Sequence, residues 1–173
     1  MEAKLQRRVQ RYGWDKAVVD YETGWRDQLE PAQSMMLDMA ELQPGEQVLN
    51  VACGTGLVSF RAINAVGETG AVVGTDISGE MVETARRTAA ERNIGNASFE
   101  RRDAEDLDLD SGPFDTALCG LGLMYVPEPV TALGEMRRLL KPGGRAAAAV
   151  WGARAKCGWA EIFPITDARV ASE

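Results

Sequence analysis

The sequence predicts an α/β fold in which helices cover both faces of a mainly parallel, doubly wound sheet. Two observations carry this prediction. Short apolar runs alternate with segments of helical periodicity from Gln47 onward, and glycine, proline, asparagine or aspartate bounds each run. The chain has 173 residues, 45% of them hydrophobic, which is enough to bury one ordinary core but not two.

The segment before the first strand, residues 1–42, is predicted to be helical. It contains an aromatic cluster of Tyr12, Trp14, Tyr21 and Trp25. The apolar face of its last turns is formed by Ala32, Met35, Met36 and Met39. Aromatic side chains most often pack, so the segment either covers the sheet or forms a helical lid over a ligand. Residues 43–173 would then be the core domain.

Five strands and two connecting helices account for the rest of the pattern. The predicted strands are 47–51, 71–76, 97–102, 116–119 and 145–151. Ser78 is a suitable N-cap for a helix with Met81, Val82, Ala85 and Ala89 on one face. Pro129 starts a second helix that ends near Lys141, with Val130, Leu133, Met136, Leu139 and Leu140 as its buried stripe. Right-handed crossovers leave ligand space at the carboxyl ends of the strands.

Composition limits the classes of function. The formal net charge of -7 disfavours a nucleic-acid partner and favours small or neutral substrates. Cys53, Cys119 and Cys157 lack paired CxxC spacing, so we expect no metal site and a reducing cytoplasm. No apolar stretch is long enough to span a bilayer. The chain has no histidine, the commonest general base, so its chemistry must need little proton transfer.

The most informative motif runs from Val48 to Gly56, where an apolar strand enters a turn of small residues and then a helix. Gly54 and Gly56 allow a ligand to approach the backbone closely, and the helix start offers free N–H donors. Such a turn is typical of nucleotide-binding loops, although a tight strand-to-helix connection has the same pattern.

Two carboxylates give this turn its context. Asp76 ends the second predicted strand, 20 residues after Gly56, where it can accept both hydroxyl hydrogens of a ribose. The alternative is that it caps the helix that begins near Ser78. Asp103, just after the third strand, can accept from the exocyclic amine of an adenine, although acidic loops are commonly only solvated.

Residues 45–152 resemble the class I S-adenosylmethionine-dependent methyltransferase family, in its small-molecule branch typified by ubiquinone and menaquinone biosynthesis. Four segments carry the resemblance in the family's order: 44–56, 74–78, 114–119 and 139–145. The resemblance implies a Rossmann-like sheet of strand order 3-2-1-4-5. The sixth and seventh strands of the family have no counterpart, so the fifth strand would be an open edge. Three explanations stay open: a truncated sequence, a missing segment, or a homodimer that covers this edge.

The resemblance also implies a cofactor, S-adenosylmethionine, whose product is S-adenosylhomocysteine. Its implied binding residues are Asn50, Ala52, Cys53, Gly54, Thr55, Gly56, Asp76, Ile77, Met81, Asp103, Ala104, Cys119 and Leu121. Trp14, Met124 and Tyr125 are candidates for acceptor contact. Asn50 and Ala52 depart from the family pattern, in which an acidic residue and a glycine are common at these positions. The alanine side chain adds little conformational strain if the φ of Ala52 is negative. Cys53 is interpreted as a spacer, not a nucleophile.

The expected reaction is in-line methyl transfer to a small-molecule acceptor, for which the protein mainly aligns the reactants. Nitrogen, thiol or activated carbon acceptors fit a chain without histidine better than oxygen acceptors do. Tyr12, Tyr21 and Tyr125 are the only candidates to position or assist the acceptor. Two alternatives remain open: an inactive or partner-dependent subunit that binds the cofactor, and an NAD(P)-dependent oxidoreductase.

Overall fold

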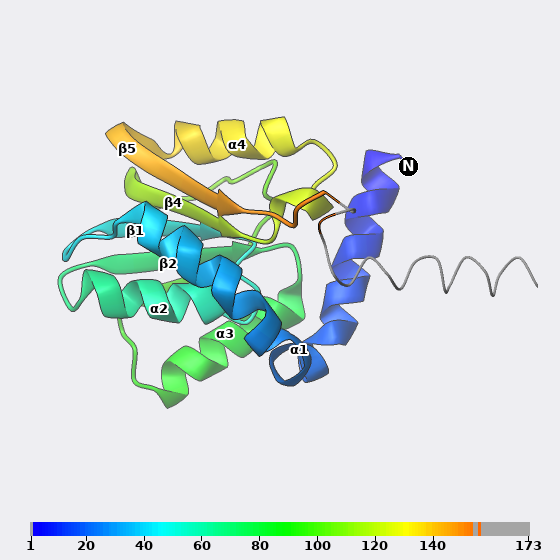
Figure 1. Cartoon of the computed structure of the whole chain (residues 1–173), viewed down its shortest axis with the longest axis horizontal. Helices are drawn as coiled ribbons and strands as arrows, with labels where there is room; N and C mark the ends of the chain where they lie inside the picture. The colour runs from blue at the N-terminus through cyan, green and yellow to red at the C-terminus, as the bar shows by residue number, and fades with distance from the viewer. Residues whose placement is uncertain (1, 154–155, 157–173) are drawn as a thin grey trace, which may run out of the picture.

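The computed structural model describes residues 2–153 and 156, which form a five-stranded sheet with helices on both faces (Figure 1). The strands are β1 (Gln47–Val51), β2 (Ala71–Asp76), β3 (Ala97–Arg101), β4 (Phe114–Gly120) and β5 (Leu140–Ala149). Their order is β3-β2-β1-β4-β5 and every pairing is parallel. The predicted fold class and strand order are therefore confirmed.

Each face of the sheet has its own apolar core. On one face, α2 (Leu57–Val66) and the end of α1 (Ala3–Ala40) pack on β1, β2 and β4. Beside them, α3 (Gly79–Glu91) packs Val82, Ala85 and Ala89 against Phe99 of β3. On the opposite face, α4 (Pro129–Arg138) covers β1 and β4. These two layers hold the carboxyl ends of the strands in fixed positions, which is where loops can build a site.

The start of α3 is the best-predicted helix boundary. Ser78 is its N-cap, and the Ser78 hydroxyl oxygen accepts a hydrogen bond of 3.1 Å from the Met81 N–H. The four residues expected on the inner face are all buried. Asp15 of α1 accepts from the Ser78 hydroxyl at 2.6 Å, so α1 is attached to this helix start.

The buried stripe of α4 differs from the prediction. Val130 and Leu133 are 79% and 43% exposed, whereas Ala132, Met136 and Leu139 face the core. The helix also ends at Arg138, earlier than expected. The spacing of 132, 136 and 139 is helical, but a small alanine gives a weaker hydrophobic signal than the neighbouring leucine. Close packing on the sheet needs the small residue.

Helix α1 extends over 38 residues and changes direction midway, so that its two halves cover different parts of the molecule (Figure 1). Pro31 lies inside the helix, where it removes one N–H donor. The predicted apolar face was wrong in part: Met36 is buried and Ala32 half-buried, but Met35 and Met39 are 66% and 75% exposed. The buried positions are Leu29, Gln33, Met36 and Ala40. This stripe is at helical spacing but includes a polar residue, which concealed it in the sequence.

Strand β5 begins five residues before its predicted start. Phe114 pairs with Leu140 and Thr116 with Arg145, so the four residues between them, 141–144, bulge out of the sheet. Lys141 was predicted to end the preceding helix. It instead lies in β5, where its ammonium pairs with Asp115 at 2.7 Å. Only one residue separates α4, which ends at Arg138, from β5, which begins at Leu140. The Pro142 to Gly144 stretch, expected between helix and strand, is accommodated by the bulge instead.

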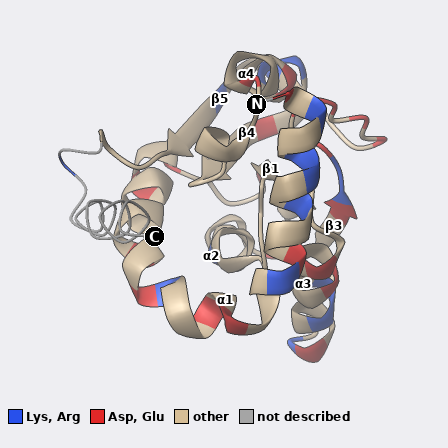
Figure 2. Ribbon diagram, turned by 90° about the vertical axis from the view of Figure 1, so that its right-hand side faces the viewer, with Lys and Arg blue, Asp and Glu red and all other residues tan. Residues whose placement is uncertain are grey.

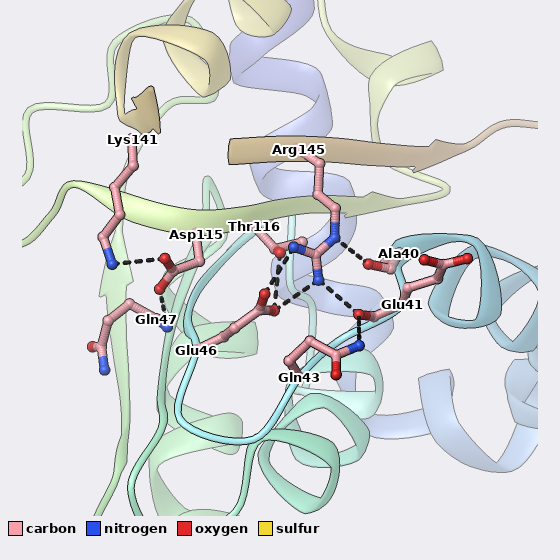
Figure 3. Close-up of polar contacts among 9 residues, drawn as sticks. All are labelled: Ala40, Glu41, Gln43, Glu46, Gln47, Asp115, Thr116, Lys141 and Arg145. Carbon is pink, nitrogen blue, oxygen red and sulfur yellow. Dashed lines mark hydrogen bonds and ion pairs between the residues drawn. The ribbon is translucent and has the colours of Figure 1, made fainter. Parts of the chain in front are cut away.

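Arg145 joins the end of α1 to the sheet (Figure 3). Its guanidinium donates to the Glu46 carboxylate at 2.7 and 2.9 Å and to the Ala40 and Glu41 carbonyl oxygens. Beside it, the Asp115 carboxylate accepts from the Gln47 N–H at 2.8 Å. These contacts lie at the amino ends of the strands, opposite the candidate site, and fix where the long helix enters the sheet. The segment 157–170, whose apolar residues predict a further helix interrupted by Pro164, lies outside the described residues.

Candidate functional site

A pocket opens at the carboxyl ends of the strands, beneath the amino-terminal half of α1. Its empty space is about 730 Å³ when the open solvent at its mouth is included. Its lining residues come from all the elements that meet there: Arg7, Gln10, Trp14, Tyr21, Ala52, Gly54, Asp76, Ile77, Met81, Arg102, Asp103, Ala104, Gly120, Leu121, Gly122, Tyr125, Val126 and Pro127. The amino-terminal helix and the loops after four of the strands therefore build one site.

The glycine turn and Asp76 form one hydrogen-bonded unit at the centre of this pocket. The Gly54 N–H donates to one oxygen of the Asp76 carboxylate at 2.8 Å, and the Ser78 N–H donates to the other at 2.9 Å. Gly54 has a φ of 56° and Gly56 a φ of 94°, in the left-handed region that favours glycine. Asp76 thus orients the turn and also helps to begin α3, while its remaining lone pairs stay available to a ligand.

Burial raises the pKa of Asp76 above its ordinary value, because loss of water disfavours the charged carboxylate. The Ser78 and Gly54 N–H donors offset part of this rise, and the nearby Asp15 carboxylate adds to it. Only 8% of Asp76 is exposed. A partly desolvated acceptor with two fixed donors is well suited to bind neutral hydroxyl groups.

The φ of Ala52 is not negative, so its side chain is not free of conformational strain. Its φ is +54°, in the left-handed region, where a side chain costs roughly 1–2 kcal/mol. A Cβ built on Gly122 would lie 2.4 Å from the Ala52 Cβ, so Gly122 leaves the space that the alanine methyl group needs. The two residues form neighbouring parts of the pocket wall.

Several expected cofactor contacts lie behind the pocket wall and do not line it: Asn50, Cys53, Thr55, Gly56 and Cys119. The Asn50 amide donates to the Ser59 hydroxyl at 2.8 Å, while the Asn50 carbonyl oxygen and the Thr55 hydroxyl are buried without a partner among the described residues. Burial raises the pKa of the Cys53 thiol, and that of Cys119 to about 12. Both thiols therefore stay protonated, as a spacer role for Cys53 requires.

Aromatic side chains from α1 and from the 3-10 turn η1 (Leu123–Tyr125) close the pocket from above. The Trp14 ring is 5.3 Å from that of Tyr125 and 5.9 Å from that of Tyr21, both edge to face. Tyr21 lies over the glycine turn, since a Cβ on Gly54 would be 3.7 Å from its ring. Burial, with Asp76 nearby, raises the pKa of Tyr21 to about 12.

Two of the predicted acceptor residues lie elsewhere. Tyr12 is 53% exposed on α1 and stacks under the Arg11 guanidinium, away from the pocket lining. Met124 is half-buried and does not line the pocket either. On a helix, residues 12 and 14 point in directions about 200° apart, so only one of them can face the site.

The loop after β3 supplies Asp103 and Ala104 to the lining, as expected, but sequence reasoning missed its partner. Arg7 of α1 lies against this loop, with its Nε 2.9 Å from the Asp103 carboxylate and its Nη2 2.6 Å from that of Glu105. The other lining residues that were missed are Gln10, Arg102, Gly120, Gly122, Val126 and Pro127. No spacing rule links Arg7 to residues nearly a hundred positions away.

A second hollow lies on the outer side of α1, between that helix and the end of β3. Its basic residues are Lys4, Arg7, Arg8, Arg11, Arg101 and Arg102, and its acidic residues are Asp103, Asp106 and Asp108. Figure 2 shows the basic residues gathered along the amino-terminal half of α1. Four of these cations lie within residues 4–11 of the sequence at helical spacing, but the sequence analysis did not single them out. Within the described residues, no helix could cross a membrane and no group of three metal-ligating side chains occurs.

Comparisons with known proteins relate the chain to methyltransferases. Residues 42–156 match the model of a methyltransferase domain family. The aklanonic acid methyltransferase DauC of a Streptomyces species is 36% identical over 117 residues, 68% of this chain and 53% of that protein. The demethylmenaquinone methyltransferase of Oceanobacillus iheyensis is 38% identical over 104 residues, 60% of this chain and 44% of that protein. The chain thus spans about half the length of the curated relatives it matches.

A solved methyltransferase structure has the same fold as this chain. A SAM-dependent methyltransferase from Aquifex aeolicus superposes with a TM-score of 0.63 at 25% identity, covering 69% of this chain and 63% of that one. The family match covers well over half of the sequence and includes the glycine turn, Asp76 and Asp103. The chain belongs to the class I S-adenosylmethionine-dependent methyltransferase family.

Proposed function

We propose that this protein transfers a methyl group from S-adenosylmethionine to a small-molecule acceptor. The observation that carries the proposal is the unit in which Asp76 accepts from Gly54 and Ser78 in the lining of the pocket. This unit places an oriented carboxylate beside backbone that has no side chain. A nucleoside with a linear extension needs both features.

The lining residues fit the cofactor chemically. In the proposed arrangement Asp76 accepts from the ribose hydroxyls, Ile77 and Met81 contact the adenine, and Asp103 accepts from its amine. The amino-acid part would lie along the stretch of pocket wall that Gly54, Gly120 and Gly122 line, at the ends of β1 and β4. The expected cofactor residues that do not line the pocket would support its wall from behind: Asn50, Cys53, Thr55, Gly56 and Cys119.

Bound S-adenosylmethionine supplies an electrophilic methyl group on a sulfonium, so the chain's own task is alignment and exclusion of water. Trp14, Tyr21 and Tyr125 close the pocket over the glycine turn and suit that task. Leu121 and Tyr125 are the proposed acceptor contacts. The acceptor's nucleophilic atom forms the new bond to carbon, and the sulfur keeps the electron pair of the broken bond.

We also propose that the acceptor atom loses its proton without help from a strong base. The only carboxylates among the described residues that line the pocket are Asp76 and Asp103, and both already accept hydrogen bonds. The raised pKa of Tyr21 makes it a neutral donor. A nitrogen, thiol or activated carbon acceptor meets this condition. Relatives named for aklanonic acid and demethylmenaquinone support a small-molecule acceptor.

Two further parts of the proposal concern the location of the protein in the cell and its oligomeric state. A cytoplasmic location is supported by the two free, buried thiols of Cys53 and Cys119. A homodimer through β5 is supported by the pairing of this strand with β4 alone among the described strands. Sedimentation velocity tests it: a dimer supports edge pairing, and a monomer at all concentrations contradicts it.

A turnover assay tests the proposed reaction. The protein is incubated with methyl-labelled S-adenosylmethionine and a panel of quinols, amines, thiols and carbon acids, and S-adenosylhomocysteine is quantified. Label transfer to an acceptor, lost in Asp76→Ala, supports the proposal. Tight cofactor binding with no transfer to any member would favour an inactive or partner-dependent subunit.

A further inference from the structure

We infer that Arg7, on the lid-like half of α1, is a positioning residue that orients Asp103 for recognition of the adenine base. The inference rests on the proposed function. It assigns to α1 a part in cofactor specificity, beyond covering the pocket.

The first argument is geometric. Arg7 lines the pocket and contacts two carboxylates of one loop: its Nε is 2.9 Å from Asp103 and 2.8 Å from Glu105, and its Nη2 is 2.6 Å from Glu105. A planar guanidinium engaged by two acids has few orientations left. Arg7 and Asp103 are each about one-third exposed, at 34% and 29% for their side chains, and are reachable from the pocket.

The second argument is that Glu105 is the buried anchor of this arrangement. Its side chain is only 4% exposed, and its other carboxylate oxygen accepts from the Glu128 N–H, the N-cap of α4. The loop after β3 is thereby fixed to two helices. Because Glu105 holds Arg7 in place, Arg7 can hold Asp103 without being displaced by solvent.

The third argument concerns the state of Asp103. One of its oxygens accepts from the Glu105 N–H at 3.0 Å, and the other meets Arg7. The side chain is therefore held from both sides, with acceptor capacity left for an amine. An oriented carboxylate accepts from the adenine amine and rejects a carbonyl oxygen at the same place. Loss of Arg7 frees Asp103 to rotate, so both affinity and discrimination should fall.

The hollow outside α1 supplies an independent electrostatic observation. Lys4, Arg8 and Arg11 of α1 face Asp106 and Asp108 of the same loop across it. The helix thus carries several cations toward an acidic loop, but only Arg7 reaches the pocket. Arg8 is a matched control, since its removal deletes the same charge from the same helix without touching Asp103.

Calorimetry with two ligands tests the inference. S-adenosylhomocysteine and S-inosylhomocysteine, which has a carbonyl oxygen in place of the adenine amine, are titrated into the full chain and its variants. We expect Arg7→Ala to bind S-adenosylhomocysteine roughly tenfold more weakly, which corresponds to about 1.4 kcal/mol. Its preference over the inosine analogue should shrink. Arg7→Lys should be intermediate, and Arg8→Ala should match the wild type.

Three results would overturn the inference: wild-type affinity in Arg7→Ala, equal losses in Arg7→Ala and Arg8→Ala, or weaker binding with unchanged base preference. The last would leave Arg7 as a purely structural contact. If Arg7→Ala does not fold, Arg7→Gln gives the same test of base preference, since it keeps a long polar side chain but removes the charge that pairs with Asp103. Failure of the wild type to bind S-adenosylhomocysteine would contradict the proposed function itself, a distinguishable outcome.

Discussion

The methyl group of Ala52 occupies space that Gly122 leaves empty, since a Cβ on Gly122 would lie only 2.4 Å from the Ala52 Cβ. The family has glycine at position 52, and this chain keeps an alanine there at a φ of +54°. The missing side chain of one residue therefore compensates for the extra side chain of the other.

This relationship predicts the stability of three variants. Ala52→Gly should raise the free energy of unfolding by about 1 kcal/mol, because a left-handed backbone no longer carries a side chain. Gly122→Ala should lower it by about 1–3 kcal/mol through overpacking. The double variant should recover much of that loss, and urea denaturation measures all three. Additive effects would contradict the compensation.

The Arg145 contacts at the amino ends of the strands should matter for stability and not for binding. Arg145→Ala removes donors to Glu46 and to two carbonyl oxygens at the end of α1, so we expect a loss of about 1–2 kcal/mol with unchanged affinity for S-adenosylhomocysteine. Arg26→Ala is the control, since it breaks only the exposed pair with Glu22. Equal losses of stability in both variants would show that the Arg145 contacts stabilise the fold no more than an exposed ion pair does.

Cofactor affinity should depend on pH through Asp76. Because burial raises its pKa, the folded chain holds this proton more readily than the unfolded chain, and stability from the protonated form is lost as pH rises through the raised value. Ribose binding needs the ionised form. Affinity should thus be full above the raised pKa and fall about tenfold per pH unit below it.

The Asp15 carboxylate adds to this rise, so Asp15→Asn should move the midpoint of the affinity profile to lower pH. Asn keeps an oxygen that can accept from the Ser78 hydroxyl, which makes the variant conservative. Titrations of S-adenosylhomocysteine across the acidic range measure the midpoint. An unmoved midpoint would mean that another group controls the profile.

Ligand binding should be visible in the fluorescence of Trp14. This indole lines the pocket and contacts the rings of Tyr21 and Tyr125, whereas Trp25 is 49% exposed and lies outside the lining. We expect S-adenosylhomocysteine to change the emission of the wild type and of Trp25→Phe, and the change to be lost in Trp14→Phe. A response that survives in Trp14→Phe would place α1 outside the binding event.

The sequence predicted most reliably what depends on local pattern. The strands β1 and β2 and the Ser78 cap follow from apolar runs and capping chemistry within a few residues. The buried faces of α1 and α4 were predicted only in part. Met36, Met136 and Leu139 are buried as expected. Gln33 and Ala132 were missed because they are core positions with little hydrophobic signal. Packing against a particular partner decided those faces.

The site shows the same division between local and distant information. Gly54, Asp76 and Asp103 were found from their positions at strand ends, and all three line the pocket. The role of Gly122 depends on the φ of Ala52, and that of Arg7 on carboxylates 96 and 98 residues along the chain. Neither follows from spacing, since each needs the folded arrangement.

The most direct test of the central claim is calorimetric binding of S-adenosylhomocysteine to the wild type and to Asp76→Ala, with NADH as the control ligand. The account predicts one site per chain, roughly 100-fold weaker binding in the variant because two charge-assisted contacts and the turn they orient are lost, and no binding of NADH. Binding of NADH in place of S-adenosylhomocysteine, or equal affinity in both proteins, would contradict it.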